Sequence, residues 1–332
     1  MTLLEIKLKG FFILSLLGNL NLSIYLDFET TLLILLANHF NMENRKNFFV
    51  KSHGLGNEYV VFDSAEIDFP INEKSIKRIC NIHYGIGSDG ILLLVPSTKA
   101  DFGFKVFNPD ASEAEKSGNG LRIFCKFLYD YKYTDKKQFS IETKGGIVQA
   151  SIDEIRNGKA YLVTIDLGKA TFKCNEIPVN LDQEECIDFP LKIDDKNFKI
   201  NCVSVGNPHC VVICENLDEK EVLKYGPLLE NHPMFPNRTN VQFVKPISKN
   251  EVEILIWERG AGFTMASGSS SSAVASIMLK KGLTGNDITV KMPGGQLSIK
   301  IDKNWEIKLC GEVRQIAEGY LDSELLDDFN LS

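Results

Sequence analysis

Short apolar segments separated by turn residues recur along the chain from Phe48 onward. Segments such as EYVVFD, GILLLVP, FGFKVFN and EVEILIWERG are rich in β-branched and aromatic residues and are bounded by Gly, Asn, Asp or Pro. Runs of this length and composition are typical of β-strands. The pattern therefore predicts a strand-rich chain.

Two segments space their apolar residues as a helix does. LRIFCKFLYDYKY follows the turn Ser117–Gly120, and SSAVASIMLKKGL follows the turn Ser267–Ser270. The two turns lie 267 − 117 = 150 residues apart, which predicts a duplicated α+β unit. We expect one half at 42–160, a second at 161–312, and a segment at 313–332 that returns to the first half.

Residues 1–41 do not fit this scheme. They are apolar but carry Asp27 and Glu29, and their longest apolar run is shorter than the roughly 18 residues of a membrane span. Met42 begins a stretch that reads like a natural protein start. We therefore expect residues 1–41 to be an extension outside the fold.

Composition and charge narrow the function classes. The 332 residues are 44% hydrophobic and 24% charged, and the formal net charge is −7 without a long run of either sign. This argues against a nucleic-acid or membrane partner. The eight cysteines are scattered without metal-ligand spacing, so we expect no metal site and reduced, mostly buried thiols in a cytoplasmic protein.

The two small-residue turns are candidate binding sites. A helix that begins with Gly, Asn and Ser presents free backbone N–H groups at the positive end of its dipole, where a carboxylate can bind. Two such turns facing each other could hold one amino acid and place a side chain on each face of its α-carbon. The simpler alternative is that Ser117 and Ser267 only cap their helices.

The flanks of both turns carry a family resemblance. Residues 108–120, NPDASEAEKSGNG, and residues 257–273, WERGAGFTMASGSSSSA, resemble the two catalytic signatures of diaminopimelate epimerases. The segments KSHGLGNEYVVFD, HYGIGSDGILLL, IETKGG, GNPHCVV, FPNRTNVQFV and MPGGQL are further matches in family order. The chain is thus identified as a member of this family from about residue 48 onward.

The resemblance implies an α+β fold of two pseudo-symmetric domains, each a curved, mostly antiparallel sheet wrapped around a central helix. It also implies a cofactor-independent isomerase that converts LL-2,6-diaminopimelate to the meso form in lysine and peptidoglycan precursor synthesis. The partner is then a small amino-acid substrate, and a homodimer is compatible with the sequence.

The resemblance also assigns site residues. Substrate-binding positions match Asn57, Asn108, Asn207, Asn240, Glu258 and Arg259. The backbone N–H groups that hold the substrate match Gly118, Asn119, Gly268 and Ser269, and the residues thought to tune the catalytic groups match His209 and Glu258. For each Asn taken alone, a turn or cap role is the usual alternative.

The chain departs from the family pattern at both catalytic positions, where the resemblance implies cysteine and Ser117 and Ser267 stand instead. A thiol has a pKa of about 8.5, whereas a hydroxyl resembling water lies near 15.7, a gap of roughly 10 kcal/mol. A helix dipole contributes only about 0.3 to 2 kcal/mol. Three hypotheses follow: an epimerase, a catalytically impaired protein that binds a diamino acid, and an isomerase that uses His209 and Glu258 as acid and base.

Overall fold

The computed structural model describes residues 11–13, 25–27 and 46–330. Strands β1 (Phe11–Ile13) and β2 (Tyr25–Asp27) pair with each other in a separate two-stranded sheet. The rest of the predicted extension, residues 1–41, lies outside the described residues. The description of the main fold begins at Lys46, two residues before the strand that starts at Phe48.

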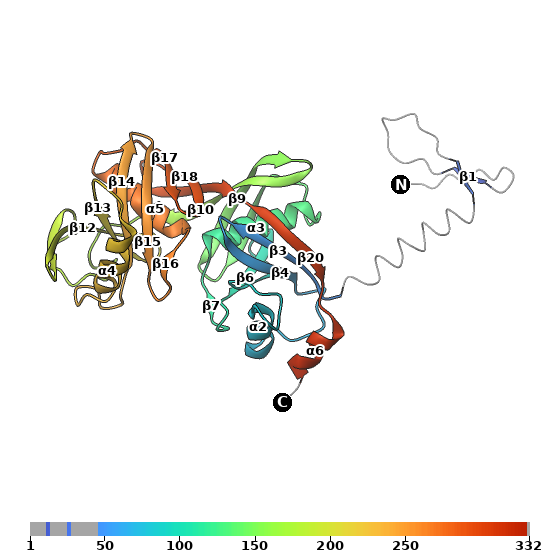
Figure 1. Cartoon of the computed structure of the whole chain (residues 1–332). Helices are drawn as coiled ribbons and strands as arrows, with labels where there is room; N and C mark the ends of the chain where they lie inside the picture. Colours follow the sequence, from blue (N-terminus) through green and yellow to red (C-terminus); the bar gives the residue numbers. More distant parts are fainter. Residues whose placement is uncertain (1–10, 14–24, 28–45, 331–332) are drawn as a thin grey trace.

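Two halves of the chain repeat the same order of elements. The first half contains β3 (Phe48–Gly54), β4 (Asn57–Asp63), α2 (Glu73–Cys80), β5 (Ile91–Val95), β6 (Phe102–Phe107), β7 (Glu113–Ala114), α3 (Gly118–Asp130), β8 (Gln138–Thr143), β9 (Gly146–Arg156) and β10 (Lys159–Lys169). The second half contains β12 (Lys196–Ser204), β13 (Pro208–Ile213), α4 (Glu219–Glu230), β14 (Asn240–Ser248), β15 (Glu251–Glu258), β16 (Gly262–Thr264), α5 (Gly268–Lys280), β17 (Asp287–Met292), β18 (Gly295–Ile301) and β19 (Glu306–Glu312). Figure 1 shows the halves side by side, with α3 in one and α5 in the other.

The two halves also share the same pattern of strand pairing. In the first half, β3 pairs with β4, β4 with β5, β5 with β6, β6 with β8, and β8 with β9. The second half repeats these pairings in the same senses from β12 to β18. Only the pairings that follow a helical connection are parallel, since such a connection can carry the chain back across the sheet. This arrangement confirms the predicted α+β fold of two similar halves.

Strands β10 and β19 join the two halves. β10 pairs antiparallel with β9 and also with β19, so it spans the boundary that was predicted between residues 160 and 161. Strand β20 (Arg314–Tyr320) pairs with β3 of the first half, as β11 (Phe189–Ile193) pairs with β12 of the second. The last described element is α6 (Ser323–Asn330), and its apolar residues pack with those of the first half.

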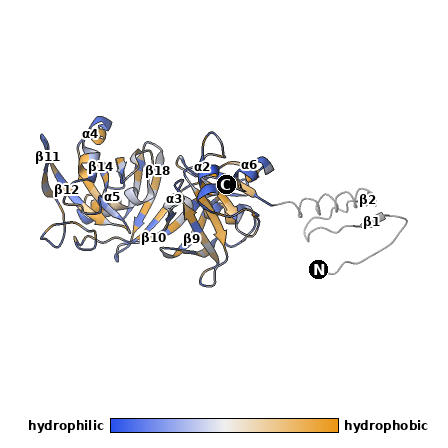
Figure 2. Cartoon of the chain, turned by 90° about the horizontal axis from the view of Figure 1, so that it is seen from below, coloured by the Kyte–Doolittle hydropathy of each residue, from blue (hydrophilic) through white to orange (hydrophobic). Residues whose placement is uncertain are grey.

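Each half wraps its sheet around one buried helix. Residues 119–128 of α3 and most residues of α5 are buried, so these helices have no solvent-exposed polar face along most of their length. Strand β8 alternates exposed and buried positions, and Figure 2 shows the corresponding mixture of hydrophilic and hydrophobic colours along the strands. Because α3 and α5 are packed inside their sheets, their positions are fixed, and so are the positions of the turns that begin them.

Cysteine burial follows the expectation, since all eight thiols are free, six of them buried and two partly exposed. Within the described part of the chain, no helix combines the length and the apolar character needed to cross a membrane.

Candidate active site

The two helix N-termini lie in contact. A Cβ atom built on Gly118 would be 3.9 Å from the Cα atom of Gly268, and a Cβ atom built on Gly268 would be 3.9 Å from the Cα atom of Gly118. The helices α3 and α5 are thus brought together at their first residues, which carry free N–H groups. The duplicated turns form one site rather than two.

Both serines cap their helices. Ser117 has extended backbone, and its Oγ accepts a hydrogen bond of 3.1 Å from the Gly120 N–H. Ser267 is also extended, and its Oγ accepts from the Ser270 N–H at 3.4 Å. The capping role predicted from sequence therefore exists, but each hydroxyl has a second partner that capping does not require.

The second partners come from outside the helices. The Oγ of Ser267 donates to Oε2 of Glu258 at 3.1 Å, and the Oγ of Ser117 lies 3.2 Å from the phenol oxygen of Tyr59. The Oγ of Ser269 lies 3.4 Å from that of Ser267. Burial, the largest cause, raises the pKa of the Glu258 carboxyl above its ordinary value, and the hydrogen bond from Ser267 opposes this. Each serine is therefore paired with a titratable group.

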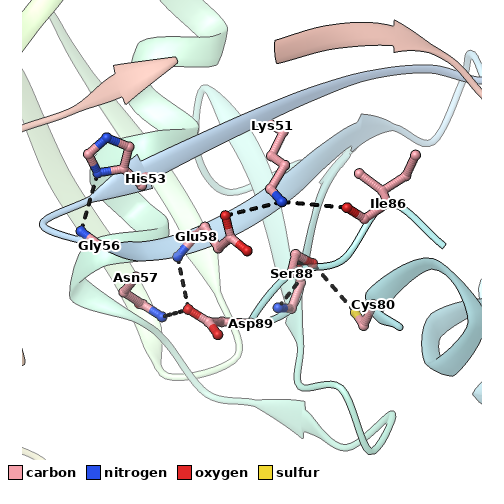
Figure 3. Close-up of polar contacts among 10 residues, drawn as sticks. Lys51, His53, Gly56, Asn57, Glu58, Cys80, Ile86, Ser88 and Asp89 are labelled. Carbon is pink, nitrogen blue, oxygen red and sulfur yellow. Dashed lines mark hydrogen bonds and ion pairs between the residues drawn. The ribbon is translucent and has the colours of Figure 1, made fainter. Parts of the chain in front are cut away.

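A polar chain supports the first helix N-terminus, and Figure 3 shows its first contact, between Asn57 and Asp89. The side chain of Asn57 donates to Oδ2 of Asp89 at 2.8 Å and accepts from the side chain of Asn119 at 3.1 Å. Asn119 in turn accepts from the guanidinium of Arg122 at 2.9 Å. Asn57 and Asn119, two of the residues predicted from the sequence, therefore lie at the first helix N-terminus. Their side chains are hydrogen-bonded to each other.

Arg122 places a positive charge behind this helix N-terminus. Its side chain is fully buried, and besides Asn119 it donates to the Gly118 carbonyl at 3.2 Å. Burial lowers the pKa of Arg122 to about 10. Among the described residues, no carboxylate lies within salt-bridge distance of it. An anion bound at the adjacent N–H groups would therefore supply a countercharge that Arg122 lacks.

His209 lies behind the second helix N-terminus without a hydrogen bond to either serine. It is fully buried, and its Nε2 is 2.9 Å from Oδ1 of Asn207. Burial is the largest cause that lowers the pKa of His209 to about 3, with the Arg259 charge acting in the same sense and the Gln242 side chain opposing it. Gln242 donates to Ser270 in the first turn of α5 at 3.0 Å. Gln242 therefore reaches the first turn of α5, whereas the Nδ1 of His209 is buried without a hydrogen-bond partner among the described residues.

Asn240 holds the Glu258–Arg259 turn in place. Its Oδ1 accepts from the backbone N–H of Arg259 at 3.0 Å, and its Nδ2 donates to the Pro208 carbonyl at 2.9 Å. The exposed Arg259 guanidinium donates to the Asn237 carbonyl at 3.0 Å and keeps other donors available.

Asn108 and Asn207 have local partners. The Asn108 side chain donates to Oγ of Ser112 at 2.9 Å within its own turn, whereas Asn207 is held by His209. The structure therefore brings the two serines, the two helix N-termini, Glu258 and Asn57 together, whereas the side-chain hydrogen bonds of Asn108, Asn207 and His209 go to other partners.

Several residues at the site were not expected from the sequence. Tyr59 is one, and the alternation of side chains along a strand could have indicated it, because it follows Asn57 by two residues. Lys116 is another: its Nζ donates to the Leu167 carbonyl at 2.7 Å, and its side chain approaches Gly206 of the other half. Arg122 lies one helical turn after Gly118. Its long side chain reaches back to the helix N-terminus, and that length is the one sequence signal that could have indicated a role at the site.

Solved structures share this fold. A hydroxyproline epimerase from Agrobacterium vitis aligns with a TM-score of 0.63 at 14% identity, over 82% of this chain and 90% of that one. A methylitaconate-delta-isomerase aligns with a TM-score of 0.61 at 16% identity, over 84% and 96% of the two chains. At these identities the likeness establishes the fold.

Sequence comparison gives the family. The Diaminopimelate epimerase family profile matches residues 49–173 and 201–316. Diaminopimelate epimerase 2 of Nostoc sp. is 46% identical over 278 residues, covering 83% of this chain and 96% of its own length. The diaminopimelate epimerase of Acetivibrio thermocellus is 39% identical over 275 residues, covering 82% and 98%. The chain belongs to the diaminopimelate epimerase family.

Proposed function

We propose that the protein is an amino-acid epimerase that converts LL-2,6-diaminopimelate to the meso form. The observation that carries the proposal is the contact between the two helix N-termini, with Ser117 and Ser267 each paired with a titratable side chain. Epimerisation requires proton removal on one face of the α-carbon and proton delivery on the other. Two capped helix N-termini facing each other supply one side chain for each face.

The surrounding groups suit an amino-acid substrate. Backbone N–H groups at Gly118–Asn119 and Gly268–Ser269 are donors for its carboxylate, and buried Arg122 gains a countercharge when that carboxylate binds. The exposed guanidinium of Arg259 is suited to a carboxylate at the distal end of a diamino acid. A Cβ atom on either Gly118 or Gly268 would lie only 3.9 Å from the Cα atom of the other, so we expect the halves to separate slightly to admit the substrate.

The proposal assigns the proton transfers to Ser117 and Ser267 with their partners. His209 is fully buried and neutral at physiological pH, because its pKa is lowered to about 3. We therefore assign it the positioning of Asn207, which its Nε2 contacts at 2.9 Å, rather than direct proton transfer.

Deuterium exchange tests the proposal. The protein is incubated with LL-diaminopimelate in heavy water, and α-deuterium and the stereoisomers are followed by NMR and chiral chromatography. Incorporation with inversion supports an epimerase. Thermal stabilisation by the ligand without exchange supports the binding protein instead and refutes the proposal.

A thiol variant sharpens the test. We expect Ser117→Cys with Ser267→Cys to raise the exchange rate by at least about 100-fold, because a thiol is a far stronger acid than a hydroxyl. A matched control is Ser276→Cys, which places a thiol in the buried body of α5. A double cysteine variant that folds, binds ligand and does not exchange contradicts the assignment.

We also propose a cytoplasmic location and a homodimer. The location is supported by eight unpaired cysteines, which persist in a reducing compartment. The homodimer is supported by edge strand β20, which pairs only with β3 among the described strands and exposes Ile316 and Tyr320. Sedimentation of the wild type against Ile316→Lys tests it; a wild type that sediments as a monomer refutes it.

A further inference from the structure

The two serine hydroxyls at the site have opposite hydrogen-bond polarity. Ser267 donates its proton to Glu258, since an ionised carboxylate is only an acceptor. Its oxygen accepts one backbone bond from Ser270, and its remaining lone pair faces Ser269 at 3.4 Å or a substrate. Ser267 therefore offers an acceptor.

Ser117 has the reverse arrangement. Its oxygen accepts from the Gly120 N–H, and the buried phenol of Tyr59 lies 3.2 Å away. Burial is the largest cause that raises the pKa of Tyr59, and the carboxylates of Asp89 and Glu258 add to it. Hydrogen bonding with Ser117 and Asn57 acts in the opposite sense, but the net shift is upward, so the phenol keeps its proton. A buried O–H requires an acceptor, and the Oγ of Ser117 is at hydrogen-bonding distance. Tyr59 therefore donates, and the proton of Ser117 is left free.

The fold holds the Tyr59 ring in this position. A Cβ atom on Gly90 would lie 2.9 Å from Cε1 of Tyr59 and 2.4 Å from the Phe107 carbonyl, so only glycine leaves room for the ring there. Tyr59 also lies on the same strand, β4, as Asn57, which bonds to the first helix N-terminus. The phenol is thus built into the site rather than resting against it by chance.

We propose that Tyr59 is a positioning residue that supplies protons to Ser117, as Glu258 receives them from Ser267, so that the site has a fixed donor face and a fixed acceptor face. This inference rests on the proposed epimerase function. The substrate Cα–H bond breaks and its proton moves to Oγ of Ser267, whose own proton moves to Glu258. On the opposite face the Ser117 proton forms the new Cα–H bond while the Tyr59 proton moves to Oγ of Ser117.

The proton count balances. Glu258 gains one proton and Tyr59 loses one, so the total charge of the pair is unchanged, and no oxidation or reduction occurs. Solvent then removes the proton from Glu258 and returns one to the Tyr59 phenolate. Protonation of the carbanion is easier with the phenol behind Ser117, because a phenolate is a much weaker base than a free alkoxide.

The experiment compares exchange with inversion in Tyr59→Phe. In heavy water the wild type is expected to incorporate deuterium mainly with inversion. Without the phenol, Ser267 and Glu258 still remove the α-proton but return deuterium to the same face. We expect inversion to fall by about 100-fold or more, while exchange with retention persists. A merely structural role would lower both rates together, so that result overturns the inference.

Three further variants complete the design. Tyr225→Phe is the matched control, because this buried tyrosine bonds Asp195 and belongs to a different hydrophobic cluster from Tyr59, so the substitution should leave both rates unchanged. Ser117→Ala and Ser117→Ala with Tyr59→Phe should invert at the same low rate if Tyr59 acts through Ser117; an additive loss overturns the inference. A wild type that neither exchanges nor inverts refutes the proposed function and the inference with it. An active wild type matched by Tyr59→Phe refutes the inference alone.

Discussion

Replacing Gly118 by alanine separates the binding role of the first helix N-terminus from its structural role. A Cβ atom at this position would lie 3.7 Å from Cδ2 of Leu167 and 3.9 Å from Cδ1 of Ile165, which are ordinary van der Waals distances. The backbone there is helical, so alanine adds no strain and removes some conformational freedom from the unfolded chain. We expect unfolding stability to be unchanged or to rise by up to about 1 kcal/mol.

Activity should respond in the opposite sense. The added methyl would stand 3.9 Å from the Cα atom of Gly268, between the two sets of N–H groups. Displacing a bound carboxylate from one charge-assisted hydrogen bond costs about 1.5 to 3 kcal/mol, which corresponds to a decrease of about 10- to 150-fold in kcat/KM. The decrease should appear in the deuterium-exchange assay, while calorimetry shows a melting temperature at or above that of the wild type.

The matched control is Gly285→Ala. Gly285 is exposed, and a Cβ atom there meets nothing closer than the Lys249 carbonyl at 3.8 Å. We expect this variant to match the wild type in rate. If Gly118→Ala melts normally and exchanges at the wild-type rate, then the helix N-termini do not hold the substrate carboxylate and the reasoning is refuted.

Three other variants test the surrounding residues. His209 is held neutral by burial with a pKa of about 3, so the stability it contributes is complete above pH 6.5 and is lost as the pH falls toward 3. Between pH 6 and 4, the wild type should lose about 1.4 kcal/mol per pH unit relative to His209→Gln in chemical denaturation; parallel curves contradict this. Arg259→Ala should weaken ligand binding in a titration without a change in melting temperature, and unchanged affinity removes Arg259 from the site. Asn240→Ala should lower unfolding stability by about 2 to 3 kcal/mol, because both ends of its amide bond to backbone groups; a loss below 1 kcal/mol contradicts this scaffold role.

The sequence was sufficient to predict the duplicated fold. Apolar runs bounded by turn residues correspond to the strands, and the two segments of helical spacing correspond to α3 and α5, because local spacing determines which face of an element can be buried. A boundary between the halves near residue 160 is harder to predict from the sequence, because β10 pairs with strands of both halves. A pairing between residues 150 positions apart leaves no local sequence signal.

The site was predictable in part. The turns at Ser117 and Ser267 were located because small residues before a helical run are a local pattern, and the family resemblance added Glu258. Tyr59 was missed because it belongs to a strand whose apolar pattern already explains a buried aromatic residue. Its hydroxyl gains significance only when the fold brings it to Ser117, which lies 58 residues further along the chain.

The order of strands constrains when the protein can fold during synthesis. The edge strand of the first half, β20, is among the last segments to leave the ribosome, and β10 remains without its β19 neighbour until shortly before that. The first half therefore emerges with two unsatisfied strand edges and must wait for the entire second half to be translated. Chaperone occupancy on the nascent chain should accordingly persist until β20 has emerged.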